Sequence, residues 1–426
     1  MKVLIITYYW VPAGGSGVQR WLKFVKYLRD FGIEPIVFTV ENPNYPITDS
    51  SLANEIPNNI SVVKNPIWEP NHLLSIFKKE KTKTSAGFLN PNPGIIEKSL
   101  QYIRANYFIP DARMFWIQPS VKKLKQYLSS HKIDAIISTG PPHSMHLIGL
   151  HLKKELGIKW IADFRDPWTD IDYFHQLPLT QRAKEKHLTL EKEVLKQADA
   201  TIVVGKTMKR NYLKFTDNIH VITNGFDTES TNEKRSTPSK NFTLTHIGLM
   251  NADRNPKMLW EVLNELSTEI TEFDNDLEIK LIGSIADEVT KNIQAYAFKN
   301  TTHISYVPHS EVKKHQQEAQ VLLLAVNNVP SAKGIITGKI FEYLQAKRPI
   351  LAIGPEEGDL AEILLRTNAG TIVDFNNKSK LKEVILHLYQ QYKNNNNEVN
   401  SKHIQKYHRK ELTQQLANLI KETINS

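Results

Sequence analysis

The sequence has no cysteine and no long hydrophobic run, and both absences narrow its chemistry. Without cysteine, the 426-residue chain cannot form disulfides, bind metal through thiolates or use a thiol nucleophile. Its apolar runs fall well short of the ~20 residues of a membrane-spanning helix. The first segment, "MKVLIITYYW", predicts a buried strand rather than a secretory signal, because its apolar stretch is short and no small-residue cleavage site follows. We therefore expect a cytoplasmic protein.

The charge balance is basic, with 54 Lys and Arg against 45 Asp and Glu and a formal net charge of +9. Such a surplus can attract nucleic acid, an anionic membrane or a phosphorylated substrate. The sequence contains no RNA- or DNA-binding motif, so nucleic acid is not an expected partner. A solvated basic surface is the simplest explanation of the charge.

Short β-branched runs alternate with helical patterns from one end of the chain to the other. The first half contains "KVLIIT", "EPIVFTV" and "DAIISTG", and the second contains "FTLTHIG", "LEIKLIG" and "VLLLAVN". Nearly continuous apolar runs are typical of parallel strands that are covered on both faces. The alternation therefore predicts an α/β fold of doubly wound sheets, and the length predicts two domains.

The polar stretch "NGFDTESTNEKRSTPSKN" separates the two series of strands and predicts a hinge. We expect an N-terminal domain over residues 1–220, a second domain over 221–401 and a last helix over 402–426. A basic and aromatic insertion, residues 78–118, interrupts the first domain. Its composition fits peripheral contact with an anionic membrane, although a plain helical insert with a solvated face explains it too.

A glycine cluster, "GGSGVQR", lies between the first predicted strand and the first predicted helix. Gly15 and Gly17 match the start of the dinucleotide-binding fingerprint, but Arg20 occupies its last glycine position. The stretch from Tyr8 to Gly14 also makes the loop too long for the tight turn of that motif. The cluster therefore predicts that the backbone approaches a ligand other than NAD.

A second glycine site is "TGKIFEYLQAKRPIL", in the second half of the chain. Thr337 and Gly338 precede Lys339 at the start of a predicted helix, where free amides and the helix dipole favour a phosphate. Glu342 follows a few residues later, where its carboxylate can accept two ribose hydroxyls. A helix cap beside a solvated Lys–Glu pair explains the same residues without a ligand.

A third site is "GLMNADRNPKMLW", in which Gly248 ends a strand and Arg254 follows in the loop. The planar guanidinium of an arginine at this end of a strand can clamp a diphosphate. By itself Arg254 is more simply a surface arginine. Because the same predicted domain also contains the phosphate-favouring loop at Lys339, a diphosphate site becomes the better explanation.

These motifs, taken in order, resemble those of glycosyltransferase family 4, retaining enzymes of GT-B fold that use nucleotide-sugar donors. The resemblance covers nearly the whole chain. "GGSGVQR" resembles the family's first glycine loop, "VITNGFD" its Asn-Gly-x-Asp motif, and "STGPPHSMHLIG" and "ADFRDPW" its loops that face the transferred sugar. It implies two Rossmann-like domains facing a cleft, with a C-terminal helix that returns to the N-terminal domain.

The residues and the resemblance together suggest a set of site residues. The donor-binding candidates are Gly15, Gly17, Asn224, Gly248, Arg254, Lys257, Thr337, Gly338, Lys339 and Glu342. Asp166 and His143 are the catalytic candidates, because a carboxylate or an imidazole in these loops can orient the acceptor. A turn or N-cap explains Asp166 equally simply, a helix cap explains His143, and a structural ion pair with an arginine explains Asp163. No metal-binding spacing occurs, so we expect no metal and no cofactor beyond the nucleotide sugar.

Two departures from the family pattern leave alternatives open. The family's first glutamate, which contacts the donor sugar, falls here on Gly334, and the phosphate lysine has to be Lys257 or Lys339. We predict a retaining hexosyltransferase that moves a hexose from a nucleotide-diphosphate sugar to a glycan or lipid-linked acceptor in cell-surface polysaccharide synthesis. The alternatives are a nucleotide-sugar 2-epimerase of the same fold and a catalytically silent nucleotide-sugar-binding module. An NAD-dependent dehydrogenase is a more distant one.

Overall fold

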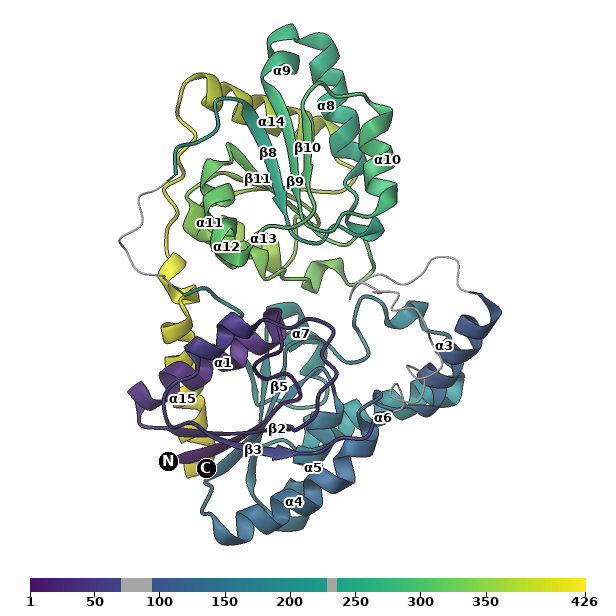
Figure 1. Cartoon of the computed structure of the whole chain (residues 1–426), viewed down its shortest axis with the longest axis vertical. Coiled ribbons are helices and arrows are strands. Elements are labelled where there is room, and N and C mark those ends of the chain that lie inside the picture. Colours follow the sequence, from purple (N-terminus) through teal and green to yellow (C-terminus); the bar gives the residue numbers. More distant parts are fainter. Residues whose placement is uncertain (70–93, 228–235) are drawn as a thin grey trace. The chain divides into compact units, whose positions relative to one another are not determined.

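The computed structural model describes residues 1–69, 94–227 and 236–426. These residues form two compact units, each built on one parallel sheet with helices on its faces (Figure 1). Unit 1 comprises Met1–Asn224 and Arg409–Ser426, and unit 2 comprises Gly225–His408. The lysines of the predicted insertion at positions 78 to 83 lie outside the described residues.

The sheet of unit 1 has seven strands in the order β3-β2-β1-β4-β5-β6-β7, all paired in parallel. Its strands are β1 (Lys2–Ile6), β2 (Glu34–Val40), β3 (Ser61–Asn65), β4 (Ala135–Gly140), β5 (Lys159–Phe164), β6 (Ala200–Val203) and β7 (Ile219–Val221). Its helices are α1 (Ser16–Leu28), α3 (Ile95–Tyr107), α4 (Ile117–Ser130), α5 (Ser144–Leu156), α6 (Gln181–Gln197), α7 (Lys206–Tyr212) and α15 (Arg409–Asn425). The strand order reverses between β1 and β4. Because connections leave these neighbours in opposite directions, the loops after them bound the crevice where such sheets bind ligands.

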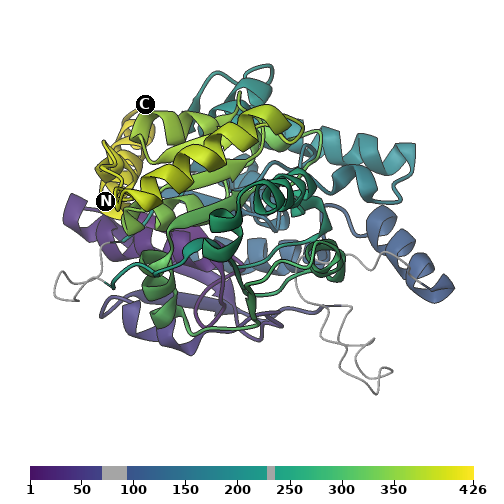
Figure 2. The same ribbon diagram turned by 90° about the horizontal axis from the view of Figure 1, so that it is seen from above.

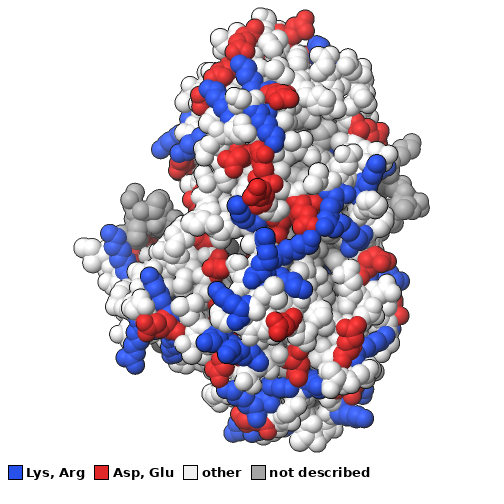
Figure 3. Space-filling model, turned by 180° about the vertical axis from the view of Figure 1, so that it is seen from behind, with Lys and Arg blue, Asp and Glu red and all other residues white. Residues whose placement is uncertain are grey.

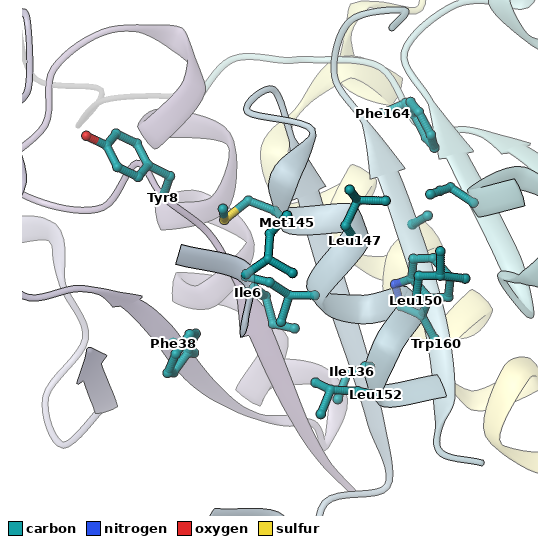
Figure 4. Packing of buried hydrophobic residues seen from close by; sticks show 14 of the residues in the cluster. Ile6, Tyr8, Phe38, Ile136, Met145, Leu147, Leu150, Leu152, Trp160 and Phe164 are labelled. Atoms are coloured by element: carbon teal, nitrogen blue, oxygen red, sulfur yellow. The ribbon is translucent and has the colours of Figure 1, made fainter. Parts of the chain in front are cut away.

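Both faces of this sheet are buried, as the continuous apolar runs predict. Ile6 of β1 points into a cluster that includes Phe38 and Trp160, which Figure 4 shows packed with side chains of α5. Ile5, the neighbouring residue, points to the opposite face, where it joins a cluster with Trp21 of α1. Successive side chains of a strand point to opposite faces of the sheet. A strand that is buried on both faces is therefore apolar at every position and does not alternate between apolar and polar residues.

The sheet of unit 2 has six strands in the order β10-β9-β8-β11-β12-β13, again all parallel. Its strands are β8 (Phe242–Ile247), β9 (Leu277–Ile282), β10 (Thr301–Ile304), β11 (Val321–Ala325), β12 (Ile350–Ile353) and β13 (Gly370–Val373). Its helices are α8 (Lys257–Glu269), α9 (Thr271–Asp276), α10 (Asp287–Ala295), α11 (His309–Glu318), α12 (Lys339–Ala346), α13 (Asp359–Thr367) and α14 (Lys378–Lys393). Here the order reverses between β8 and β11, and the predicted phosphate-binding loops follow these two strands.

The C-terminal helix α15 belongs to unit 1, as predicted, although it begins at Arg409 rather than at residue 402. The preceding residues form a short 3-10 helix, Ile404–Tyr407, in unit 2. Leu416 and Ile420 of α15 are fully buried in the same apolar cluster as Trp21 of α1. Figure 1 shows α15 in yellow alongside α1 in purple. The last helix therefore completes the core of the first unit.

The surface charge is mixed. On the face drawn in Figure 3, Lys and Arg side chains are interspersed with Asp and Glu. Some charged side chains of the surface form exposed ion pairs, such as Lys125 with Glu155 at 2.5 Å. Within the described part of the chain, no helix combines the length and the hydrophobicity that crossing a bilayer requires.

Candidate functional site

The glycine loop of unit 1 holds α1 against the end of β5. Gly15 precedes α1 with a φ of +91°, a backbone conformation that favours glycine. Position 17 favours glycine because space is lacking: a Cβ there would collide with Nη1 of Arg165. The two glycines thus let a helix N-terminus and a guanidinium lie against each other.

A cavity of about 270 Å³ lies beside this loop. Four of the predicted residues line it together: Gly15, Gly17, Asp166 and Asn224. Arg165, which the sequence analysis did not select for the site, lines it too. The cavity is small compared with ordinary ligand pockets of ~300–1,000 Å³, and polar groups surround it from several loops.

Arg20, which occupies the last glycine position of the dinucleotide-binding fingerprint, holds the segments around this cavity together. Its side chain is 1% exposed, and its Nη2 lies 2.9 Å from Oδ1 of Asp163 at the end of β5. Nη1 donates to the backbone oxygen of Thr223 at 2.8 Å and to Oδ1 of Asn224 at 3.3 Å. One arginine therefore connects α1, β5 and the segment that carries Asn224.

Asp163 is the buried counterion of this arrangement. Trp21 Nε1 and Thr139 Oγ1 each donate to its Oδ2 at 2.8 Å. Burial alone would raise the pKa of Asp163, but the charge of Arg20 and these hydrogen bonds lower it below its ordinary value. The structure thus contains the ion pair foreseen for Asp163, and its partner is Arg20 of α1.

Arg165 instead holds the loop after β4. Its Nε donates to the backbone oxygen of Gly140 at 3.3 Å, and its Nη2 donates to that of Pro141. The next residue, Asp166, lies in a bend, caps no helix and has an exposed side chain at the cavity. Neighbouring protein atoms displace water from around the Asp166 carboxyl, and this desolvation raises its pKa. The positive charge of Arg165 opposes the rise. The cavity wall therefore presents a guanidinium beside a carboxylate.

His143 is buried close to this loop but is not among the residues that line the cavity. Its ring stacks on Trp168, with 4.7 Å between centroids. It precedes α5 without a side-chain capping bond, so the structure does not support the helix-cap explanation. Burial, with the nearby His146 and Arg165, holds the pKa of His143 well below its usual value. A neutral imidazole results, and its catalytic role stays a prediction.

Glu191 of α6 fixes the segment after Asp166, a role that the sequence did not reveal. It is buried, and its Oε1 accepts from Tyr212 Oη at 2.6 Å and from the backbone amide of Trp168 at 3.2 Å. Its Oε2 accepts from the hydroxyl of Thr169 at 2.5 Å. A glutamate in the middle of an amphipathic helix is ordinarily exposed, so its sequence pattern gave no signal.

In unit 2, the two predicted cations meet at one backbone oxygen. Nη1 of Arg254 donates to the carbonyl of Leu249 at 3.4 Å, and Nζ of Lys339 donates to the same oxygen at 3.2 Å. Arg254 is held further by its Nε, which donates to Oδ1 of Asn327 at 2.5 Å. These residues come from the loops after β8 and β11 and from the start of α12. Because they share this acceptor, the guanidinium of Arg254 and the ammonium of Lys339 lie close together.

The side chain of Lys339 runs over a glycine and ends on a histidine. Gly248 has a φ of +109°, and a Cβ there would lie 2.6 Å from Cε of Lys339. The Nζ atom lies 3.1 Å from Nε2 of His246, a buried residue of β8 that the sequence analysis did not select. Burial and the charge of Arg254 lower the pKa of Lys339 to about 7.

The remaining donor-binding candidates divide into two groups. Thr337 and Gly338 directly precede α12, and Glu342 lies in its first turn, where it accepts from Gln316 Nε2 at 3.3 Å. Lys257 instead starts α8 and pairs with Glu288 at 2.8 Å, with 66% of its side chain exposed. No described contact brings Lys257 to Arg254 or Lys339. Among the described residues, no three His, Asp or Glu side chains are grouped so that they could hold a metal ion.

Comparison with known proteins identifies the family that this chain resembles. Residues 88–230 match the model of a family described as Glycosyltransferase Family 4. No curated protein sequence matches the chain.

Solved structures match almost the whole chain at low sequence identity. Sucrose-phosphate synthase from Thermosynechococcus elongatus matches 100% of this chain and 99% of its own, with a TM-score of 0.63 and 13% identity. A mutant of S. aureus TarM, solved with fondaparinux, α-GlcNAc-glycerol and UDP, covers 98% of this chain and 99% of its own (TM-score 0.58, 12% identity). A Listeria monocytogenes protein provisionally assigned as a UDP-N-acetylglucosamine 2-epimerase covers 100% and 96% (TM-score 0.54, 11% identity).

At these identities, the structural likeness establishes the fold, which is the predicted GT-B fold of two α/β units. The family match confirms the predicted resemblance to glycosyltransferase family 4 and, with it, the predicted class of enzyme, a glycosyltransferase. Neither finding assigns a donor, an acceptor or a role to a residue.

Proposed function

We propose that this chain is a retaining hexosyltransferase that moves a hexose from a nucleotide-diphosphate sugar to a glycan or lipid-linked acceptor, in the synthesis of a cell-surface polysaccharide. The observation that carries this proposal is the pair of cations, Arg254 and Lys339, on the carbonyl oxygen of Leu249. Two like charges held side by side at the switch point of a parallel sheet are arranged for an anion that carries more than one charge. A diphosphate meets that requirement.

In the proposed reaction, unit 2 stabilises the leaving nucleoside diphosphate. Arg254 and Lys339 offset the charge that develops on the departing phosphate oxygens, which is the usual main source of rate enhancement in group transfer. The amides at the start of α12, from Gly338 onward, add positive potential. Glu342, in the first turn of the same helix, is the proposed acceptor of two ribose hydroxyls.

Unit 1 contributes the proposed acceptor side. The cavity beside the glycine loop combines the carboxylate of Asp166 with the guanidinium of Arg165, a pair of groups that can hold the hydroxyls of a sugar. Gly15, Gly17 and Asn224 form the backbone and amide part of the same wall. We assign to Asp166 the orientation of the attacking hydroxyl, and we retain His143 as a second catalytic candidate.

The exchange of Asp166 for asparagine tests this assignment. Wild-type protein, supplied with UDP-, GDP- and ADP-hexoses and an oligosaccharide mixture, should release nucleoside diphosphate from one donor. Asp166→Asn should bind that donor as tightly but turn it over about 100-fold more slowly, because the charged group that accepts the hydrogen bond of the attacking hydroxyl and orients it is lost. Asp170→Asn, a variant of an exposed aspartate in the same loop, should keep wild-type turnover.

The same assay separates the alternatives. Release of nucleoside diphosphate without sugar transfer to any acceptor, or isomerisation of the donor sugar at its 2-position, contradicts the transferase proposal and supports a 2-epimerase. Donor binding without any turnover supports the silent binding module, for which Gly334, in place of the family's first glutamate, is the argument. Full turnover by Asp166→Asn would contradict the role given to this carboxylate.

The proposal includes a cytoplasmic location and peripheral contact with the anionic inner face of the membrane. No residue of α3 is buried. Ile96, Ile103 and Tyr107 lie along one side of this helix and are 77%, 46% and 69% exposed. Lys98 and Arg104 are exposed on the same helix. Aromatic and aliphatic side chains next to cations suit the interface of an anionic bilayer.

Helix α6 adds more cations next to α3. Asn106 of α3 accepts from the backbone amide of Thr180, the N-cap residue of α6, at 2.7 Å. Figures 1 and 2 show the two helices together at one edge of unit 1. Exposed Arg182, Lys184 and Lys186 lie in the first turns of α6. Each cation near an anionic bilayer contributes about 1 kcal/mol of attraction.

Cosedimentation with vesicles tests the membrane contact. The wild-type chain should sediment with vesicles of phosphatidylglycerol and phosphatidylcholine, and less with phosphatidylcholine alone. Ile96→Glu with Ile103→Glu should reduce binding at least tenfold, because two apolar anchors become charges that the bilayer repels. Leu365→Glu, which changes an 83% exposed leucine of α13, is the control and should bind normally. Equal sedimentation of all three proteins would refute a role for α3.

A further inference from the structure

We infer that His246 is the positioning residue of the donor site: its Nε2 atom holds the ammonium of Lys339 beside Arg254, so that a lysine from the start of α12 serves as the phosphate-binding lysine. This inference rests on the proposed function and names the residue on which that function depends. Arg254 and Lys339 are the groups that would touch the donor. His246 acts through Lys339.

The hydrogen bonds of His246 define which of its nitrogens carries the proton. Nδ1 lies 3.2 Å from the backbone oxygen of Leu323 in β11, and a carbonyl oxygen can only accept. Nδ1 is therefore the protonated nitrogen, which leaves Nε2 with a lone pair facing Nζ of Lys339 at 3.1 Å. Burial and the charge of Lys339 hold the pKa of His246 well below its usual value, so the ring stays neutral. A neutral imidazole of this tautomer is an acceptor built for an ammonium group.

The surroundings restrict Lys339 to this position. Gly248 leaves the space through which the lysine stem passes, and a side chain there would meet Cε. The Nζ atom then has two acceptors, Nε2 of His246 and the carbonyl oxygen of Leu249. An ammonium has three protons, so one donor direction remains after these two bonds. The same carbonyl also accepts from Arg254, which keeps the two cations together.

This geometry makes the binding of a diphosphate dependent on pH. Among the described residues, Arg254 from the loop after β8 disfavours the charge on Lys339, and Glu342 of its own helix favours it. The neutral ring of His246 from β8 also favours the charged form, because its Nε2 accepts from the ammonium. With a pKa of about 7, the free lysine loses its proton as the pH rises above neutrality. A bound diphosphate favours the charged form, so binding above pH 7 takes up a proton and weakens as the pH rises. The second ionisation of a phosphate, near pH ~6, is complete in that range.

Calorimetric titration of the full chain with UDP, GDP and ADP between pH 6.5 and 9 tests the inference. The affinity of the nucleotide that binds should fall by about tenfold per pH unit above pH 7. His246→Phe should weaken binding about tenfold at pH 7, because the ammonium loses its acceptor. His246→Asn should do the same, because its shorter side chain places the amide near the position of Nδ1 and does not reach that of Nε2. In both variants the decline with pH should begin at a lower pH, since the charged form of Lys339 is then less stable. His246→Gln, whose amide oxygen can accept, should recover part of the affinity.

Two further variants serve as references. Lys339→Arg should bind with little dependence on pH in this range, because a guanidinium stays charged. His387→Phe, which alters an exposed histidine of α14, should match the wild type. Wild-type affinity and pH profile in the folded His246 variants, with binding lost in Arg254→Ala, would overturn the inference and leave the proposed function intact. Binding of none of the three nucleotides to the wild type would instead refute the proposed donor site.

Discussion

Asp163→Asn should lower the free energy of unfolding of unit 1 by about 3–5 kcal/mol, the largest stability effect that we expect from a conservative exchange. The substitution removes the charge that faces Arg20 at 2.9 Å, in a place where both side chains are almost completely buried. Arg20 then stays desolvated without a counterion. Urea denaturation followed by tryptophan fluorescence is the measurement, since the indole of Trp21 donates to Asp163 itself.

The pH dependence gives this prediction a second readout. The pKa of Asp163 is lower in the folded chain than in the unfolded one, so its contribution is complete above the ordinary aspartate pKa of ~3.9 and is lost as the pH falls below it. Asp163→Asn should lack this acid-labile part of the stability. Glu155→Gln is the control, because its ion pair with Lys125 is exposed and such pairs contribute ~0–1 kcal/mol. A similarly small loss in Asp163→Asn would show that the buried pair does not hold the glycine loop.

Arg20→Leu combined with Asp163→Asn refines the test. If the two side chains act as a pair, the double variant should lose less than the sum of the single losses, by a coupling of about 0.5–3 kcal/mol. Strict additivity would mean that Arg20 stabilises unit 1 through Thr223 and Asn224 and not through the carboxylate.

Arg20 shows what the sequence could and could not reveal about the site. The residue at the last fingerprint position is a local feature of the sequence, and the arginine there argued against a dinucleotide as the ligand. The partner of Arg20 lies on β5, far along the chain, and no local pattern links the two positions. The sheets were predictable for the opposite reason, because a strand covered on both faces leaves its mark as an uninterrupted apolar run.

In the donor site, too, some residues could be predicted from the local sequence and others could not. Arg254, Lys339 and Glu342 follow strands or open a helix, positions that can be read from the chain. His246 could not be found this way, since a single histidine in the apolar run "FTLTHIG" is usually a satisfied core residue. Lys257, near Arg254 in sequence, is the first residue of α8, and its side chain pairs with Glu288 of α10. The lysine that shares an acceptor with Arg254 is Lys339, which is distant from it in sequence.

Arg254→Ala should abolish the stabilisation of unit 2 by a nucleoside diphosphate. Wild-type protein with ligand at ~100 times its dissociation constant should gain about 2.7 kcal/mol of stability, visible as a rise in melting temperature. The variant loses the guanidinium beside Lys339 and should show no rise at the same concentration. In an activity assay it should lose about 2–4 kcal/mol of transition-state stabilisation.

The reason for so large an effect is that Arg254 does two things at once. It is the one permanently charged member of the pair, since Lys339 titrates near neutrality, and its bonds to Asn327 and Leu249 tie the loop after β8 to the loop after β11. Arg366→Ala, which removes an exposed arginine of α13 that pairs with Glu362, controls for the loss of a positive charge from the unit. Lys257→Ala should also keep the wild-type shift, because that lysine is engaged with Glu288.

Glu342→Ala separates the diphosphate from the nucleoside. This variant keeps both cations, so inorganic pyrophosphate should bind to it as it does to the wild type, while the nucleoside diphosphate should bind more weakly for want of the ribose contact. Arg254→Ala should lose both ligands. An equal rise in melting temperature for the wild type, Arg254→Ala and Glu342→Ala would mean that nucleotides bind elsewhere on the chain, and the cluster at Leu249 would then need another ligand.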